Sequence, residues 1–217
     1  MIKLRAVFEK QGRAKYISHL DLNRCMLRTF RRSKLPVWYT EGFNPHPYFS
    51  FALALSLGYE SSCEILDFNL NEEMPFDVIR DRLNAVMPEG MKIISVAERR
   101  TKITEITEAE YEITLSSPDI PGLSAAVESL MAGESINVEK KTKKGVKTVD
   151  IKPFIKLVSF EQEGNTFKLI MRLPAGTQTN YNPGLFLDAL KNAGFRDFDT
   201  ENIRRSAILC EKNKIFF

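Results

Sequence analysis

The order of hydrophobic patterns along the first hundred residues is the feature that most constrains the fold. Residues 2–8 alternate between apolar and basic or small side chains, which is typical of a half-buried strand. A helical pattern then runs from Ser18 to about Lys34 and stops before Pro36. A strand pair, a second helix and a last strand follow before residue 98. This order predicts an α+β sandwich in which helices cover one face of an antiparallel sheet.

The second half of the chain repeats this order more loosely. Strand and helix patterns alternate again from Glu110 to Cys210. Residues 99–108 between the halves are mostly charged or threonine, with little apolar content, as in a linker. We therefore predict two ferredoxin-like (βαββαβ) sandwich domains in tandem, residues 1–98 and residues 109–217, joined by a linker at about 99–108.

Length and composition exclude several classes of protein. The chain has 217 residues, of which 43% are hydrophobic and 27% are charged, so it is neither disordered nor fibrous. No run approaches the roughly 18 apolar residues that span a bilayer. The first residues lack the apolar block and small-residue cleavage site of a signal peptide. We therefore expect a cytoplasmic protein without a membrane partner.

The three cysteines do not suggest a disulfide framework or a metal centre. Cys25, Cys63 and Cys210 are far apart and odd in number, so we expect reduced thiols. No Cys-x-x-Cys spacing is present for an iron–sulfur cluster or a zinc knuckle. On an ideal helix Cys25 lies about 240° from His19, which points their side chains apart. We predict no metal site and no cofactor bound by this chain.

Charge is distributed unevenly along the chain. The total is +3, but residues 1–34 contain ten basic and two acidic residues, and the remainder contains 21 basic and 26 acidic ones. The first 34 residues therefore carry +8 and the rest carries −5. A basic region of this kind indicates a surface that faces a polyanion, and the alternative is an ordinary solvated face.

The predicted helix at 18–34 gathers much of this charge on one side. Ser18 and Asp21 form the Ser-x-x-Asp pattern of a helix start. At about 100° per residue, one arc is apolar and a neighbouring arc of about 100° is basic. The apolar arc holds Leu20, Leu22, Met26, Leu27 and Phe30, and the basic arc holds Arg24, Arg28, Arg31 and Arg32. Because guanidinium forks bind phosphate bidentately, these four arginines, with Arg13 and Lys15 before them, predict a phosphate-tracking groove.

A second motif is the proline-punctuated segment Glu41-Gly42-Phe43-Asn44-Pro45-His46-Pro47. Two prolines fix φ and withhold backbone donors, which favours a rigid, extended loop that exposes its side chains. Phe43, Asn44 and His46 are therefore candidates to contact an unpaired base of a nucleic acid. For any single aromatic in this region, packing in the core is the alternative.

The two histidines, His19 and His46, lie in the two densest polar segments of the first half. Imidazole exchanges protons near neutral pH, so a pair brought together by the fold is a candidate acid–base pair for cleaving a phosphodiester. The alternative roles are structural. His19 would then bond nearby backbone in the first helical turn, and His46 would stiffen a turn between two prolines.

Segments 12–22, 31–37 and 39–52 together resemble an uncharacterised family of radical-SAM-linked proteins. Their most specific motifs are Ser-His-Leu-Asp at 18–21 and Glu-Gly-Phe-Asn-Pro-His-Pro at 41–47. Members of that family are encoded beside or fused behind a radical SAM protein. The resemblance implies a radical SAM partner, in which the iron–sulfur cluster would lie, and it supplies no catalytic residues.

The paired domains are also similar to those of CRISPR-repeat endoribonucleases, in which a histidine often assists RNA cleavage. The C-terminal glycine-rich loop of those enzymes is missing here, because the corresponding residues 173–177 contain a single glycine. This departure weakens a nuclease assignment.

Three functions follow from these observations. The first is an accessory RNA-binding or adaptor protein, not an enzyme on its own, that presents tRNA or rRNA to a radical SAM partner. The second is a metal-independent endoribonuclease that uses His19 and His46. The third is a protein-interaction module whose proline-punctuated loop docks the radical SAM protein directly.

Overall fold

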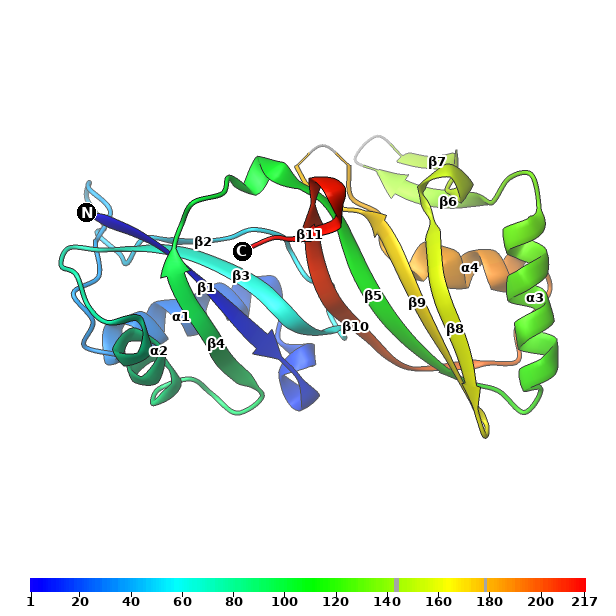
Figure 1. Cartoon of the computed structure of the whole chain (residues 1–217), viewed down its shortest axis with the longest axis horizontal. Coiled ribbons are helices and arrows are strands. Elements are labelled where there is room, and N and C mark those ends of the chain that lie inside the picture. Colours follow the sequence, from blue (N-terminus) through cyan, green and yellow to red (C-terminus); the bar gives the residue numbers. More distant parts are fainter. Residues whose placement is uncertain (143–144, 178) are drawn as a thin grey trace. The chain divides into compact units, whose positions relative to one another are not determined.

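The computed structural model describes residues 1–142, 145–177 and 179–217 (Figure 1). The chain divides into two compact units, the first formed by Met1–Glu105 with Arg205–Phe217 and the second by Ile106–Arg204. The described residues combine mostly antiparallel strands with four α-helices. The α+β class is therefore confirmed, and the tandem ferredoxin-like arrangement stays a prediction. No helix among these residues is long and apolar enough to cross a membrane.

The first unit is a sheet with two α-helices. Its strands run in the order β4-β1-β3-β10, with β2 paired to β3 and β11 paired to β10. Short 3-10 helices follow β1, precede the second unit and follow β10. The elements are β1 (Ile2–Lys10), η1 (Gly12–Tyr16), α1 (His19–Arg32), β2 (Phe49–Phe51), β3 (Glu60–Leu70), α2 (Phe76–Asn84), β4 (Met91–Glu98), η2 (Ile103–Glu105), the end of β10 (Asp199–Cys210), η4 (Glu211–Asn213) and β11 (Lys214–Ile215).

Both helices of this unit pack on the same face of the sheet. Alternation along β1 turns its apolar residues toward the helices, where they meet the apolar residues of β3. From α1 the buried residues are Leu22, Met26, Thr29 and Phe30, so three of the five residues of the predicted apolar arc are buried and Leu27 is half-buried. Leu20 is an exception: it was expected to pack but is 60% exposed.

The other face of the sheet holds a buried ion pair. Arg5 on β1 lies opposite Asp67 on β3, and its Nε and Nη2 donate to the two carboxylate oxygens at 2.7 and 2.9 Å. Each side chain is 1% exposed. Arg99 adds a weaker contact, with Nη1 3.7 Å from Asp67 Oδ2. Asp67 is thus the counter-charge for two arginines.

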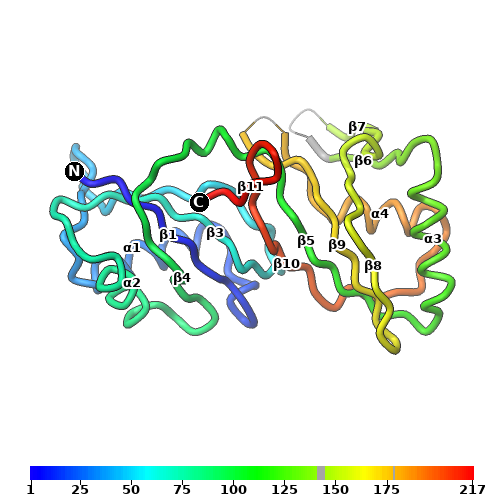
Figure 2. The backbone as a smooth tube through the Cα atoms, viewed as in Figure 1, coloured from blue at the N-terminus to red at the C-terminus, as the bar shows by residue number. Residues whose placement is uncertain are grey.

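The C-terminal residues cover this ion pair. Phe216 is buried, its N–H donates to Ile208 O at 2.8 Å, and its ring centroid lies 4.3 Å from the Arg5 guanidinium carbon. The backbone trace in Figure 2 shows this red segment among the strands of the first unit. The sequence predicts a second domain that extends to residue 217, whereas the structure places Arg205–Phe217 in the first unit. The reason is that β10 begins in one unit and ends in the other, which local patterns do not reveal.

The second unit is built from the remaining strands and helices. Its strands run in the order β10-β5-β9-β8, and β6 with β7 forms a separate two-stranded sheet. Apolar residues of α3 and α4 are buried with those of β5 and β9, among them Leu123, Val127, Leu169 and Phe186. The elements are β5 (Ile106–Ser116), α3 (Ile120–Ala132), β6 (Asn137–Thr142), β7 (Gly145–Asp150), η3 (Lys152–Phe154), β8 (Lys156–Glu163), β9 (Thr166–Pro174) and α4 (Gly184–Asn192).

Candidate functional site

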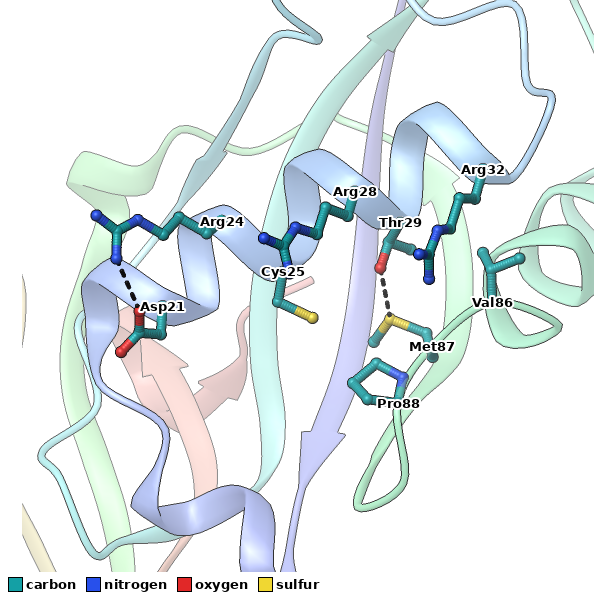
Figure 3. Close-up of a pocket in the computed structure, with 9 residues that line it drawn as sticks. All are labelled: Asp21, Arg24, Cys25, Arg28, Thr29, Arg32, Val86, Met87 and Pro88. Atoms are coloured by element: carbon teal, nitrogen blue, oxygen red, sulfur yellow. Dashed lines mark hydrogen bonds and ion pairs between the residues drawn. The ribbon is translucent and has the colours of Figure 1, made fainter.

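The basic side of α1 borders a groove of about 490 Å³ in the first unit. Figure 3 shows Arg24, Arg28 and Arg32 along α1, with Val86, Met87 and Pro88 facing them from the segment after α2. Between the two walls lie the side chains of Cys25 and Thr29, and the Thr29 hydroxyl contacts Met87 Sδ at 3.8 Å. One wall is therefore cationic and the other is apolar.

The three arginines form a row whose members differ in their contacts. They are spaced four residues apart, which separates neighbours by about 6 Å along the helix axis. Arg24 pairs with Asp21 across 3.1 Å, and both groups are largely exposed. Within the described part of the chain, the side chains of Arg28 and Arg32 have no hydrogen bond or ion pair. Two guanidiniums therefore face the groove without a protein counter-charge.

The other predicted basic residues lie outside this groove. Arg31 is exposed on α1, and Arg13 and Lys15 lie on η1 before the helix begins. The Lys15 ammonium sits 5.5 Å from the ring centroid of Tyr16, in a cation–π contact. The predicted basic residues thus follow the whole of α1, about 21 Å long for 14 residues, and do not converge on one point.

The start of α1 has the predicted cap. Ser18 Oγ accepts the Asp21 N–H at 3.1 Å and donates its own proton to the Asp21 carboxylate at 2.8 Å. The Ser18 hydroxyl and then the Arg24 guanidinium lower the pKa of the Asp21 carboxyl below its ordinary value. The cap therefore holds in place the acidic residue that engages Arg24.

Replacing Ser18 with alanine should lower the free energy of unfolding by about 1 kcal/mol at neutral pH, the usual cost of a lost N-cap. Folding lowers the pKa of the Asp21 carboxyl. The charged carboxylate therefore stabilises the folded protein at pH values above the ordinary carboxyl pKa, and this stabilisation is lost as the pH falls through the pKa of the folded state. Urea unfolding of wild type and Ser18→Ala should therefore differ less at pH about 3 than at pH about 7. An equal difference at both pH values would contradict this account of the cap.

The proline-punctuated segment forms a two-stranded finger, defined here as residues 38–48. Tyr39 bridges to Pro47, the Thr40 N–H donates to His46 O at 2.9 Å, and the Tyr48 N–H donates to Trp38 O at 3.0 Å. The rings of Trp38 and Tyr48 meet edge to face at 5.5 Å. These contacts hold the base of the finger and leave residues 41–45 as its tip.

The side chains at the tip point to solvent. Phe43 is fully exposed, and Asn44 and His46 are exposed as well. His46 Nδ1 lies 3.0 Å from Asn44 O. The same Nδ1 lies 3.1 Å from Thr40 Oγ1, so the Nδ1 side of the ring is held against the finger.

The two histidines lie on different elements of the first unit. His19 is the first residue of α1, and its ring packs edge-on against Phe51 with centroids 5.5 Å apart. Four residues of largely extended chain lie between His46 and Phe51, and the length of chain from one to the other is about 16 Å. His19 therefore lies with β2 at the start of α1, whereas His46 lies on the finger. The acid–base pair stays a prediction.

Cys25 is the nucleophilic side chain in the groove. It is a free thiol, as are Cys63 and Cys210. Burial raises the pKa of the Cys25 thiol, and the Thr29 contact and the Arg28 and Arg32 charges offset this only in part. The thiol is therefore protonated at neutral pH. Within the described ranges, no three His, Cys, Asp or Glu side chains are grouped so as to hold a metal ion.

The apolar wall of the groove is the part that sequence reasoning missed. Val86, Met87 and Pro88 follow α2 and are far from α1 in sequence, so helical periodicity gives no sign that they face it. The one local signal is Met87-Pro88 at the end of the second predicted helix. It indicates where that helix stops, and it does not indicate that these residues face α1.

The fold and groove define an α+β protein whose first unit presents an arginine-lined groove and an exposed finger. The chain belongs to the family described as "Uncharacterized protein conserved in bacteria (DUF2344)", whose sequence model matches residues 3–183. The uncharacterised family expected from the motifs is confirmed to this extent. The link to a radical SAM protein stays a prediction.

No curated protein matches the chain. Among solved structures, a chain of the "Crystal Structure of a Cbf5-Nop10-Gar1 Complex" is similar, with a TM-score of 0.49 and 11% sequence identity. The similarity covers 94% of this chain and 48% of that one, so this chain spans about half the length of the matched chain.

Proposed function

We propose that this protein binds RNA through the arginine-lined groove of its first unit and presents that RNA, of the tRNA or rRNA class, to a radical SAM partner. One observation carries the RNA proposal: Arg28 and Arg32 face the groove with no counter-charge among the described residues. Guanidinium groups without a protein partner are suited to bidentate contact with phosphate.

The length of the basic surface favours a polymer over a single small anion. From Arg24 to Arg32 the row extends about 12 Å along the helix axis. Arg13 and Lys15 on η1 continue the positive charge before the start of α1, and Arg31 adds to it between Arg28 and Arg32. Successive phosphates of one strand would occupy such a row, whereas one phosphate would use only part of it.

The partner in this proposal rests on the resemblance of residues 12–57 to radical-SAM-linked proteins. In this arrangement the arginines hold RNA and the iron–sulfur chemistry lies in the partner. The chain itself would then act by binding and positioning the RNA.

Cys25 provides a direct test of where RNA binds. A Cys63→Ser/Cys210→Ser variant keeps Cys25 as the only thiol, and its alkylation by iodoacetamide is followed by mass spectrometry at pH about 8.5. A saturating single-stranded RNA should slow alkylation several-fold, because the strand covers the groove. The matched control is Cys25→Ser/Cys63→Ser, in which alkylation of Cys210 should not change. If bound RNA leaves Cys25 alkylation unaltered, the groove is not the RNA site.

A further inference from the structure

We propose that the finger contacts an unpaired nucleotide of the same RNA, so that the ligand is single-stranded or looped RNA and not a continuous duplex. This inference rests on the proposed function and adds the class of RNA that the site accepts. Three features support it: the rigidity of the finger, the chemistry of its tip, and the apolar wall of the groove.

The finger is ordered before any ligand arrives. Besides the two backbone bonds at its base, the His46 N–H donates to Thr40 Oγ1 at 3.2 Å. Pro45 and Pro47 restrict the backbone on each side of His46. Binding of a ligand at this tip therefore costs little conformational entropy of the protein.

The tip offers contacts that suit a base and not a phosphate. It exposes a complete aromatic ring on Phe43 and a side-chain amide on Asn44, and the exposed imidazole of His46 lies next to it. Bases of unpaired nucleotides bind by stacking on aromatic rings and by hydrogen bonds along their edges. The only charged side chain at residues 41–45 is acidic, Glu41, which disfavours a phosphate there.

The groove and the finger are connected through one turn. Ser33 caps α1, Lys34 follows with φ of 55°, and Val37 bridges to Leu70 where the finger begins. Arg82 of α2 donates to Lys34 O at 3.1 Å. This turn therefore joins Arg32 to the finger. It is also hydrogen-bonded to α2, the helix that precedes the apolar wall. In this proposal, an RNA strand that leaves the groove past Arg32 continues to the finger.

The apolar wall supports the same class of ligand. Val86, Met87 and Pro88 present hydrocarbon and sulfur to the groove opposite the arginines. In a duplex the base faces are stacked inside and only sugar and phosphate meet such a wall. In a single strand the base faces are free to pack on it while the phosphates meet the arginines.

The test uses a labelled single-stranded RNA of about 12 nucleotides and a blunt duplex of the same length, with affinities measured by fluorescence anisotropy at about 50 mM salt. Wild type should bind the single strand at least about 10-fold more tightly than the duplex. Phe43→Ala should lower single-strand affinity about 10-fold, the loss of one base stack, and leave duplex affinity unchanged. Phe43→Trp should restore it. The control is Phe76→Ala, which removes a 43% exposed aromatic from α2 and should change neither affinity.

Several outcomes would overturn the inference. Unchanged single-strand affinity in Phe43→Ala rejects the finger as a base contact. If Phe43→Ala lowers the affinities for single strand and duplex equally, the inferred preference for single-stranded RNA is rejected. Unchanged RNA binding combined with lost capture of the radical SAM partner would identify a protein-docking finger instead. In each case, RNA affinity that still depends on Arg28 and Arg32 leaves the proposed function intact, whereas no RNA binding by wild type ends both proposals.

Discussion

Replacing Asp67 with alanine will destabilise the first unit by about 3–5 kcal/mol, the cost of leaving a buried charge without its partner. The Arg5 guanidinium makes two bonds to this carboxylate, at 2.7 and 2.9 Å, and both side chains are 1% exposed. Arginine does not lose its proton in a protein, so Arg5 cannot relieve the loss by becoming neutral. The Phe216 ring and the Thr101 hydroxyl, 2.5 Å from Nη1, remain in contact but carry no negative charge.

Urea unfolding followed by the fluorescence of Trp38, the single tryptophan, measures this effect in the first unit. The control is Asp81→Ala, which breaks the exposed Arg80–Asp81 pair and should cost less than about 1 kcal/mol. The double variant Arg5→Met/Asp67→Leu should recover most of the lost stability, because it removes both charges together. A loss below about 1 kcal/mol for Asp67→Ala would show that Arg5 does not depend on this carboxylate.

Reversing two groove charges, in Arg28→Glu/Arg32→Glu, will lower RNA affinity by about 100-fold or more. A hydrogen-bonded contact to a charged group contributes about 1.5–3 kcal/mol, so two lost phosphate contacts amount to about 3 kcal/mol at least. That free energy corresponds to about two orders of magnitude in Kd. Both side chains are exposed and without partners in the described residues, so the substitutions should leave the fold unchanged.

The matched control is Arg80→Glu/Arg100→Glu. It changes the net charge of the same unit by the same amount, on residues that pair with Asp81 and Glu98 and do not line the groove. The RNA affinity of this control variant should stay within about 3-fold of that of wild type, because exposed charges away from the ligand are screened by salt. Equal losses in the two double variants would mean that RNA responds to overall charge and not to the groove.

Local sequence patterns predicted the local structure of this site well. Ser18 and Asp21 are three residues apart, so their cap is formed by neighbours in the chain. Leu22, Met26 and Phe30 follow one face of a helix and pack where periodicity places them. Leu20 does not, because a helical projection gives the direction of a side chain but not where the packing surface ends.

Features that depend on distant parts of the chain were not predictable in the same way. Arg5 and Asp67 are 62 residues apart, and only the register of β1 on β3 sets them opposite each other. The groove depends on Met87 meeting Thr29 across 58 positions. The contact of the His19 ring with Phe51 is likewise formed between residues 32 positions apart, and no local pattern indicates it.

The salt dependence of RNA binding tests the central claim most directly. For single-stranded nucleic acid, the logarithm of the affinity falls with the logarithm of salt concentration by about 0.7 per phosphate neutralised. If Arg24, Arg28 and Arg32 each hold one phosphate, wild type should give a slope of about −2, and Arg28→Glu/Arg32→Glu, which keeps only the Arg24 contact, should bring it to about −0.7. A wild-type slope near zero, or the same slope in both proteins, would contradict an RNA site in this groove.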